Sequence, residues 1–458
     1  MCKITKLTHL IILLLLAHFA RDAICNLKWT RLKSGQFGSK IFKFAATSAN
    51  NSQYMFGGEI DGRYTNNLFV LNDPELDWSI VSANGSFPSR RSGSTITKLG
   101  SSLYVIGGHN DNGTLNNIYR FDTLTSNWSK VIPSNDFEFP SRTGHSASTD
   151  GKNRIFVFGG YNDDGLYLND LYKIDINIKY DPEYKTYKTF AEFTLLSDDK
   201  NVFLNPSPRE SSTLIYADNK LYLFGGYSYS AACNDGMWIY DLAYNKWTKS
   251  KSHVTPPPAE GYTGIRMGRA IVYFGGCNYS YNAHRCFNDV WNYDTIADKW
   301  TIIPASFEKP LERGHSFLFY VYDSIMLYGG SKLDNLVFND MWKLSLLLPC
   351  SDPTYSCFGN GECSGTSCSC FSGFVDHDCG TFKVDEKISS IGQTQNENVQ
   401  SADNGTCDAK TPQPTKGYFG GKYHAFSAYI KKHNYATTLV VLLLIVSILA
   451  VRARQKSD

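Results

Sequence analysis

The chain has 458 residues, of which 42% are hydrophobic and 19% are charged, and its formal net charge is +2. This near-neutral balance, with no basic stripe along the chain, argues against a nucleic-acid-binding protein. Twelve cysteines are present, and their use favours a secreted chain that is stabilised by disulfides.

The N-terminal 25 residues have the pattern of a signal peptide. A basic start, MCKITK, is followed by the apolar segment LTHLIILLLLAHFA, which is too short and too early for an ordinary spanning helix. Ala23-Ile24-Cys25 has small residues where a signal peptidase prefers them, so we expect residues 1–25 to be removed and Asn26 to begin the mature chain. An uncleaved anchor is the alternative.

Six Gly-Gly pairs recur through residues 26–347. Each pair ends a short apolar phrase such as LYVIGG or IFVFGG, and the first glycines of successive pairs are 50 to 66 residues apart. A repeat of about 50 residues with four short strands predicts a β-propeller. The pairs are Gly57-Gly58, Gly107-Gly108, Gly159-Gly160, Gly225-Gly226, Gly275-Gly276 and Gly329-Gly330.

Other elements recur in the same order in the repeats. An Asn-rich turn such as NDVWNYD opens an alternating strand after each Gly-Gly pair, and a Pro/Arg turn such as PSRTGH precedes the glycine strand in four repeats. The succession resembles the kelch repeat, whose pattern is R-x-G-H, Gly-Gly, N-D-x-W and then Trp. The resemblance implies an all-β fold, a six-bladed kelch-type β-propeller over residues 26–347. The late Trp residues are Trp78, Trp128, Trp247 and Trp300.

The repeats depart from the pattern in places. The first lacks the Arg-Gly-His phrase, the fifth (EGYTGIRM) lacks its Arg, and the third lacks the late Trp and carries an insertion at about 177–192. The sixth repeat stops after its third strand, at Leu346, whereas the N-terminal segment NLKWTRL, with Trp29, reads as a spare outer strand. We therefore expect this segment to pair into the last blade and close the ring, which removes the open edge.

The arginines of the Pro/Arg turns are candidate binding residues. In kelch domains that bind peptides, arginines at this turn line the channel mouth and grip acidic groups, and the resemblance implies the same role here. A structural role that braces the turn between blades is equally consistent with their recurrence. The four residues are Arg91, Arg142, Arg209 and Arg313.

Six cysteines follow the propeller between residues 350 and 380. A segment this short buries too little apolar surface to fold without disulfides, and the cysteine count alone leaves their pairing open. The spacing and a Gly-Asn-Gly turn at 359–361 resemble an EGF-like domain. No metal site is expected, because the preceding LLLP lacks the acidic residues of the calcium-binding variant and the spacing is wrong for zinc. The resemblance implies the pairs Cys350–Cys363, Cys357–Cys368 and Cys370–Cys379.

Cys277 and Cys286 lie at opposite ends of one hairpin loop in the fifth repeat, which predicts a local disulfide. Cys233 and Cys407 have no evident mate in the sequence. Six Asn-x-Ser/Thr sequons are expected to supply glycosylation sites in a secreted chain. They are Asn50, Asn84, Asn112, Asn127, Asn278 and Asn404.

The C-terminal part predicts a membrane anchor. Residues 381–434 are rich in Gln, Asn, Ser and Thr, which is typical of a flexible extracellular stalk. Residues 435–451 form an uncharged apolar stretch that can span a bilayer with interfacial help, and the basic residues of 452–458 read as a cytoplasmic tail. A lipid-anchor signal is the alternative, although such a signal would normally end in its apolar tail.

No catalytic residue and no cofactor is expected. The sequence has no G-x-S-x-G, H-E-x-x-H or P-loop phrase, and His145 and His315 recur in the repeat phrase as structural residues would. Kelch followed by an EGF-like module and a membrane anchor is similar to part of the attractin family.

The sequence therefore predicts a single-pass type I glycoprotein of the plasma membrane or another secretory membrane. Its propeller is expected to bind an extracellular protein or glycan. The alternative is an ectoenzyme that processes carbohydrate or resembles a copper oxidase, which a channel with convergent carboxylates and histidines would favour.

Overall fold

The computed structural model describes residues 28–345 with short gaps, together with four short strands between residues 361 and 382. All of these elements belong to a unit that ends at Glu386, and every regular element among them is a β-strand. The gaps are 33–38, 50–51, 73–76, 135–136, 184–185, 199–203, 230, 234–235, 280–283, 304–307, 322–323 and 333–335.

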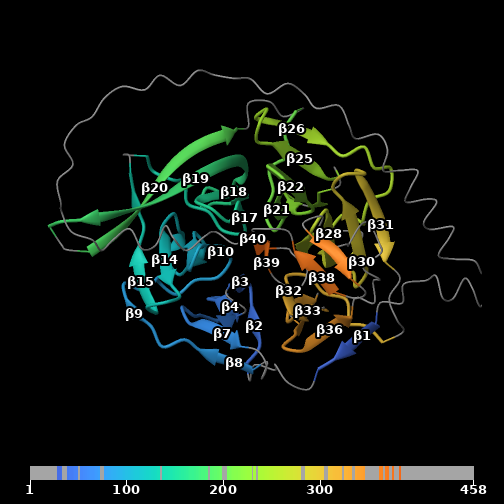
Figure 1. The fold of residues 1–458 in the computed structure, drawn as a ribbon, viewed down its shortest axis with the longest axis horizontal. Coiled ribbons are helices and arrows are strands. Elements are labelled where there is room, and N and C mark those ends of the chain that lie inside the picture. Colours follow the sequence, from blue (N-terminus) through green and yellow to red (C-terminus); the bar gives the residue numbers. More distant parts are fainter. Residues whose placement is uncertain are drawn as a thin grey trace, which may run out of the picture. The chain divides into compact units, whose positions relative to one another are not determined.

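Six antiparallel sheets form consecutive blades around a ring (Figure 1). The strands of blades 1 to 3 run outward in order. Blade 1 contains β3 (Ala45–Ala49), β4 (Ser52–Phe56), β7 (Leu68–Asn72) and β8 (Asp77–Ile80); blade 2 contains β10 (Thr95–Leu99), β11 (Ser102–Ile106), β14 (Ile118–Asp122) and β15 (Asn127–Lys130); blade 3 contains β17 (Ser146–Thr149), β18 (Arg154–Tyr161), β19 (Tyr167–Asp181) and β20 (Thr186–Ser197).

The remaining blades complete the ring. The innermost strands β3, β10, β17, β21, β27 and β32 each contact the next, and β32 contacts β3. Blade 4 contains β21 (Thr213–Ala217), β22 (Lys220–Phe224), β25 (Trp238–Asp241) and β26 (Lys246–Lys249); blade 5 contains β27 (Glu260–Met267), β28 (Ala270–Asn278), β30 (Val290–Asp294) and β31 (Lys299–Ile303); blade 6 contains β32 (Phe317–Val321), β33 (Ser324–Tyr328), β36 (Met341–Ser345) and β1 (Lys28–Arg31).

The N-terminal strand closes the ring, as predicted from the spare Trp29. Strand β1 pairs antiparallel with β36, so that Trp29 lies opposite Leu344 and Arg31 lies opposite Trp342. The Trp29 side chain is fully buried, and its ring lies 5.4 Å from that of Phe274 in blade 5. The first and last segments of the propeller therefore share one sheet and one hydrophobic core.

The outer-strand tryptophans join neighbouring blades. Each packs its ring against an aromatic residue on the second strand of the preceding blade, a contact that adds to the burial of apolar area. This arrangement explains why a Trp recurs at that position in the sequence. The pairs are Trp78–Tyr328, Trp128–Phe56, Trp247–Phe158, Trp300–Phe224 and Trp29–Phe274.

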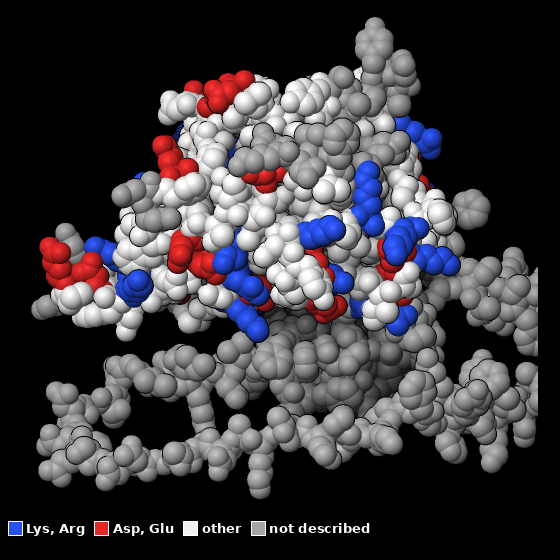
Figure 2. Space-filling view, turned by 90° about the horizontal axis from the view of Figure 1, so that it is seen from above, with Lys and Arg blue, Asp and Glu red and all other residues white. Residues whose placement is uncertain are grey.

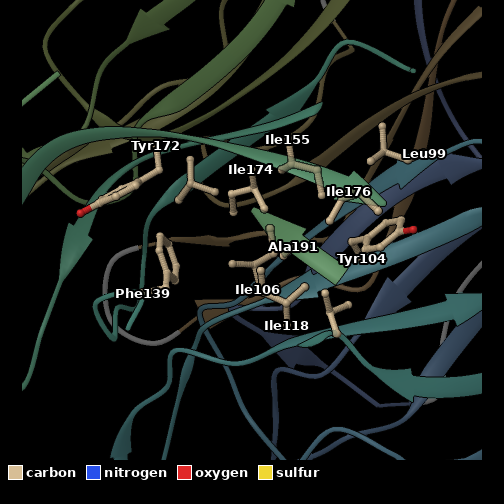
Figure 3. Packing of buried hydrophobic residues seen from close by; sticks show 12 residues of the cluster. Leu99, Tyr104, Ile106, Ile118, Phe139, Ile155, Tyr172, Ile174, Ile176 and Ala191 are labelled. Atoms are coloured by element: carbon tan, nitrogen blue, oxygen red, sulfur yellow. The ribbon is translucent and has the colours of Figure 1, made fainter. Parts of the chain in front are cut away.

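Blade 3 lacks the outer-strand Trp, and a Phe occupies the equivalent position. Phe193 pairs with Ile174 at the register position that Trp247 occupies opposite Tyr240 in blade 4. Phe193 stacks on Phe139 at 5.1 Å and packs against the buried cluster between blades 2 and 3. Figure 3 shows this cluster, with Phe139 among its residues.

The insertion in the third repeat lengthens two strands of blade 3. Strands β19 and β20 pair continuously from Tyr172 to the pair Asp181–Thr186, and they extend past the other blades (Figure 1). Tyr180 and Tyr187 form an exposed edge-to-face pair at 5.3 Å near the tip.

Two further strands, β9 (Asn84–Gly85) and β16 (Ile132–Pro133), add in parallel to β15 and β20. Separately, short pairings follow the Gly-Gly turns and lie together on one side of the blades; we call this side the hairpin face. The pairings of the hairpin face are β2 (Ile41–Phe42) with β5 (Glu59–Ile60) and β6 (Arg63–Tyr64), β12 (His109–Asn110) with β13 (Gly113–Thr114), β23 (Tyr227–Ser228) with β24 (Ala231–Ala232), β29 (Arg285–Cys286) with β28, and β34 (Ser331–Lys332) with β35 (Leu336–Val337).

Beyond the propeller, β37 (Gly361–Ser364) pairs with β38 (Ser367–Cys370), and β39 (Phe374–Val375) pairs with β40 (Thr381–Phe382). The side chains of this segment and Cys350, Cys357 and Cys379 lie outside the described residues, so the EGF-like domain stays a prediction. The same holds for segments 1–25, 383–434, 435–451 and 452–458 and for Asn50, Asn404 and Cys407, whereas β40 occupies the first two residues of the predicted stalk at 381–434. In the part of the chain that the structure describes, no helix is long and apolar enough to cross a membrane.

Candidate functional site

The four turn arginines are buried, so the expectation that they form an exposed binding rim is wrong. Each has an exposed fraction of 0%. Each guanidinium donates a hydrogen bond to the carbonyl of the first glycine of a Gly-Gly pair. The pairs are Arg91–Gly107 at 2.8 Å, Arg142–Gly159 at 3.0 Å, Arg209–Gly225 at 3.0 Å and Arg313–Gly329 at 2.9 Å.

The reason lies in the Gly-Gly pairs, where both glycines have positive φ and the strand either ends or, in β18 and β28, continues past the pair, with a register shift in β18. The chain turns there, and a buried carbonyl must find a donor. Arg313 also makes two hydrogen bonds to the carboxylate of Asp340, and its guanidinium lies 3.9 Å from the centre of the Phe338 ring. Burial raises the pKa of Asp340, but the hydrogen bonds and charge of Arg313 outweigh burial and leave that pKa below its ordinary value. The arginines therefore brace the turns between blades.

A chain of backbone hydrogen bonds runs from blade to blade around the channel. In blades 2 to 6, the N–H of one residue donates to the carbonyl of the equivalent residue in the preceding blade, at 2.7 to 3.1 Å. All six residues have positive φ, between 50° and 65°, which glycine adopts without strain. They are Lys43, Gly93, Gly144, Ser211, Gly261 and His315.

The two histidines of the repeat phrase occupy different places. His315 belongs to this backbone ring, two residues after Arg313, whereas His145 comes three residues after Arg142 and contacts Thr95 at 2.8 Å. Burial lowers the pKa of His145 to about 3 and that of His315 to about 4, with smaller effects from the charges of Arg142 and Lys43. Both imidazoles are therefore neutral at pH 7. The sequence already contained this difference, because one residue separates Arg from His in PLERGH and two residues separate them in PSRTGH.

A cavity of about 750 Å³ opens at the centre of the hairpin face. Its walls come from the ring residues and from the short pairings that follow the Gly-Gly turns. Blades 6 and 1 supply Lys332, Lys40 and Lys43, together with Glu59 and Asp61. This wall is of mixed charge.

The opposite wall, from blades 4 and 5, is acidic. Glu210 follows Arg209, and Glu260 pairs with Cys277 on β28. Ser92 and Thr143 hold the equivalent position in blades 2 and 3, where they likewise pair across the Gly-Gly turn. Burial, followed by the charge of Glu210, raises the pKa of Glu260 to about 7, and burial raises the pKa of Glu210.

Tyrosines share this part of the cavity with the two carboxylates. Tyr227 and Tyr279 line the cavity itself. Tyr167 contacts Tyr227 and Tyr229 with ring centres 6.3 Å and 5.1 Å apart. Burial and the charge of Glu210 are the leading causes that raise the pKa of Tyr167 to about 12. Burial and the charge of Glu260 raise the pKa of Tyr279 to about 12. The sequence analysis did not identify these residues, because they belong to separate repeats and share no motif.

The structure joins Cys277 and Cys286 in a disulfide that links β28 to β29, with a Cα–Cα distance of 3.9 Å. This disulfide lies next to the acidic wall, because Cys277 is the strand partner of Glu260. Cys233 is half-buried and accepts a hydrogen bond from Ser207 at 3.9 Å.

Four of the six sequons lie in the described part of the chain. Asn84, Asn112 and Asn127 are exposed, and Asn278 is half-buried. Asn84 and Asn127 are partners in the parallel pairing of β9 with β15.

Two other features bear on the chemistry of the molecule. Within the described residues, no group of three or more His, Cys, Asp or Glu side chains is placed to hold a metal ion. On the side drawn in Figure 2, basic and acidic side chains are interspersed rather than separated by sign.

Comparison with known proteins identifies the repeats. The KLHDC2/KLHL20/DRC7 Kelch-repeats domain matches residues 23–179 and 93–330. Acyl-CoA-binding domain-containing protein 5 of Arabidopsis thaliana is 27% identical over 321 residues, which are 66% of this chain and 46% of that protein. Kelch domain-containing protein 3 of Bos taurus is 28% identical over 201 residues, 42% of this chain and 48% of that protein. The chain thus spans less than half the length of these relatives.

Proposed function

Because the chain belongs to the family of the KLHDC2/KLHL20/DRC7 Kelch-repeats domain, we propose that it is a recognition protein whose propeller binds a peptide segment of a partner protein in the central cavity. One observation carries the proposal. The cavity, at about 750 Å³, lies within the size range of ligand pockets, and its wall combines charged groups with tyrosines. Tyrosine is enriched at recognition surfaces, since its ring supplies contact area and its hydroxyl a hydrogen bond.

The rigid ring beneath the cavity supports this proposal. The backbone hydrogen bonds between blades and the buried arginines fix the floor, while Tyr227, Lys332 and Val337 of the cavity lining come from the short pairings. Binding sites are often built in this way, with variable loops on a rigid scaffold.

We further propose that the protein is a single-pass type I glycoprotein of the cell surface, with an EGF-like module and a stalk between the propeller and the membrane. The support is the apolar segment at each end of the sequence, the Cys277–Cys286 disulfide, and the exposed sequons at Asn84, Asn112 and Asn127. Surface biotinylation and digestion with peptide N-glycosidase test this proposal. A chain that is neither biotinylated on intact cells nor shifted in mass by the enzyme would reject it.

The cavity is tested with a filling variant and a matched neighbour. Val337 lines the cavity, whereas the adjacent Leu336 has an exposed fraction of 42% and does not. Peptides are selected on the full-length protein from a displayed random library, and their affinity is measured by fluorescence anisotropy. We expect Val337→Trp to weaken binding at least tenfold and Leu336→Trp to leave it unchanged. Equal binding to both variants would show that the cavity is not the peptide site.

A second function is favoured by one observation. Glu210 and Glu260 are two carboxyl groups on one wall of the cavity, and a protonated and an ionised carboxyl together are the usual machinery of glycoside hydrolysis. An enzyme of this kind would release sugar from a panel of nitrophenyl glycosides, with loss of turnover in Glu260→Gln. The absence of turnover in the wild-type protein would remove this candidate.

A further inference from the structure

The wall formed by Glu210, Glu260, Tyr227 and Tyr279, which we call the acidic wall, lacks a counter-charge of its own. Within the part of the chain that the structure describes, neither carboxylate has a Lys or Arg nitrogen within ion-pair distance. Lys332, on the other wall, is paired with Glu312 at 3.3 Å. Lys43 lowers the pKa of both glutamates, but burial has the larger effect and both pKa values stay raised.

The charge and the aromatic residues of this wall favour a bound cation. Burial and mutual repulsion make two neighbouring carboxylates unfavourable, and a positive group between them would relieve both effects. The face of a tyrosine ring attracts an ammonium or guanidinium group, and Tyr227 and Tyr279 line the same cavity as the two carboxylates. Tyr167 lies next to this set, because its ring contacts that of Tyr227 with centres 6.3 Å apart.

The scaffold holds this wall in place. Ser211, a member of the backbone ring, makes a hydrogen bond to Glu260, and the Cys277–Cys286 disulfide lies directly beside it. The Oε2 atom of Glu210 lies above Gly144, where a Cβ atom would come within 2.6 Å of it. The two carboxylates are thus positioned by elements of three blades.

We propose that the acidic wall binds the positively charged side chain of a Lys or Arg in the peptide that occupies the cavity. The inference rests on the proposed function and adds the class of residue that is recognised. The proposed ligand therefore has the opposite charge to the acidic peptides that exposed arginines would bind. The turn arginines of this chain are buried and do not form such a site.

The test uses pools of fluorescein-labelled hexapeptides, random except for one fixed residue, which is Lys, Arg, Glu or Ser. Anisotropy is measured with the full-length wild-type protein, with the double variant Glu210→Gln and Glu260→Gln, and with Glu138→Gln. Glu138 is exposed and outside the cavity lining, so it controls for loss of a carboxylate elsewhere. Circular dichroism verifies folding, and each single variant replaces the double variant if the latter unfolds.

We expect the Lys and Arg pools to bind at least tenfold more tightly than the Glu and Ser pools. The preference should disappear in the double variant and persist in Glu138→Gln. Binding that Val337→Trp abolishes but that shows no preference for Lys or Arg would overturn this inference and leave the proposed function standing. Preference for the Glu pool would also overturn it. Binding that Val337→Trp leaves unchanged would reject the cavity site and, with it, this inference.

Discussion

Replacement of Arg313 by Gln should destabilise the propeller strongly. The Arg313 side chain is fully buried and donates to the carbonyls of Leu311 and Gly329 and to the carboxylate of Asp340. Its removal leaves Asp340, whose side chain is only 11% exposed, as a buried charge without its ion-pair partner. Breaking one side of a buried pair costs about 3 to 5 kcal/mol.

The measurement is the free energy of unfolding in urea, followed by tryptophan fluorescence. Arg90→Gln is the control, because Arg90 is an exposed arginine of the same turn motif, and its loss should change stability by less than about 0.5 kcal/mol.

The effect should also depend on pH. The folded-state pKa of Asp340 lies below its ordinary value, so its stabilising effect is present above the unfolded pKa and is lost as the pH falls through the folded pKa. The difference between wild type and Arg313→Gln should therefore shrink in acid. A loss of less than about 1 kcal/mol at pH 7 would refute the bracing role.

The remaining predictions concern closure, the ring, the disulfide and the cavity. Trp29→Ala should lower the free energy of unfolding by about 3 to 5 kcal/mol, because it empties a buried site between blades 5 and 6; an unchanged urea midpoint would contradict ring closure. Gly144→Ala should cost about 1 to 2 kcal/mol in the same assay, because φ is +63° there, and no cost would contradict the strain expected for a side chain at this position. Reduction of Cys277–Cys286 should cost about 2 to 3 kcal/mol, checked by melts with and without reductant. The raised pKa of Glu260, about 7, means that the folded state holds its proton more tightly, so stability from this group falls as the pH rises from the ordinary carboxyl value through 7. Glu260→Gln should flatten that slope, and a slope equal to that of wild type would assign it to another group.

The sequence by itself determined the architecture. The Gly-Gly pairs, the Asn-rich turns and the late Trp residues are local patterns that each blade repeats, so counting them predicts six blades. The spare strand around Trp29 predicted closure for the same reason, since an unfilled position in one repeat matches a surplus element at the other end of the chain. Each blade needs the same turns and packing contacts, so the residues that form them recur at regular intervals and can be recognised from the sequence alone.

Only the tertiary structure decided where the side chains of the turns point and which loops meet. The arginines were expected at a rim, but the carbonyls at the Gly-Gly turns draw them inward, because a buried acceptor without a donor is costly. Phe193 replaces a Trp because only the register of β19 with β20 brings it over blade 2. Glu210 and Glu260 lie 50 residues apart, in repeats that differ around them, and they face one cavity because blades 4 and 5 are neighbours in the ring. Their convergence depends on contacts between blades, and such contacts leave no periodic trace in the sequence.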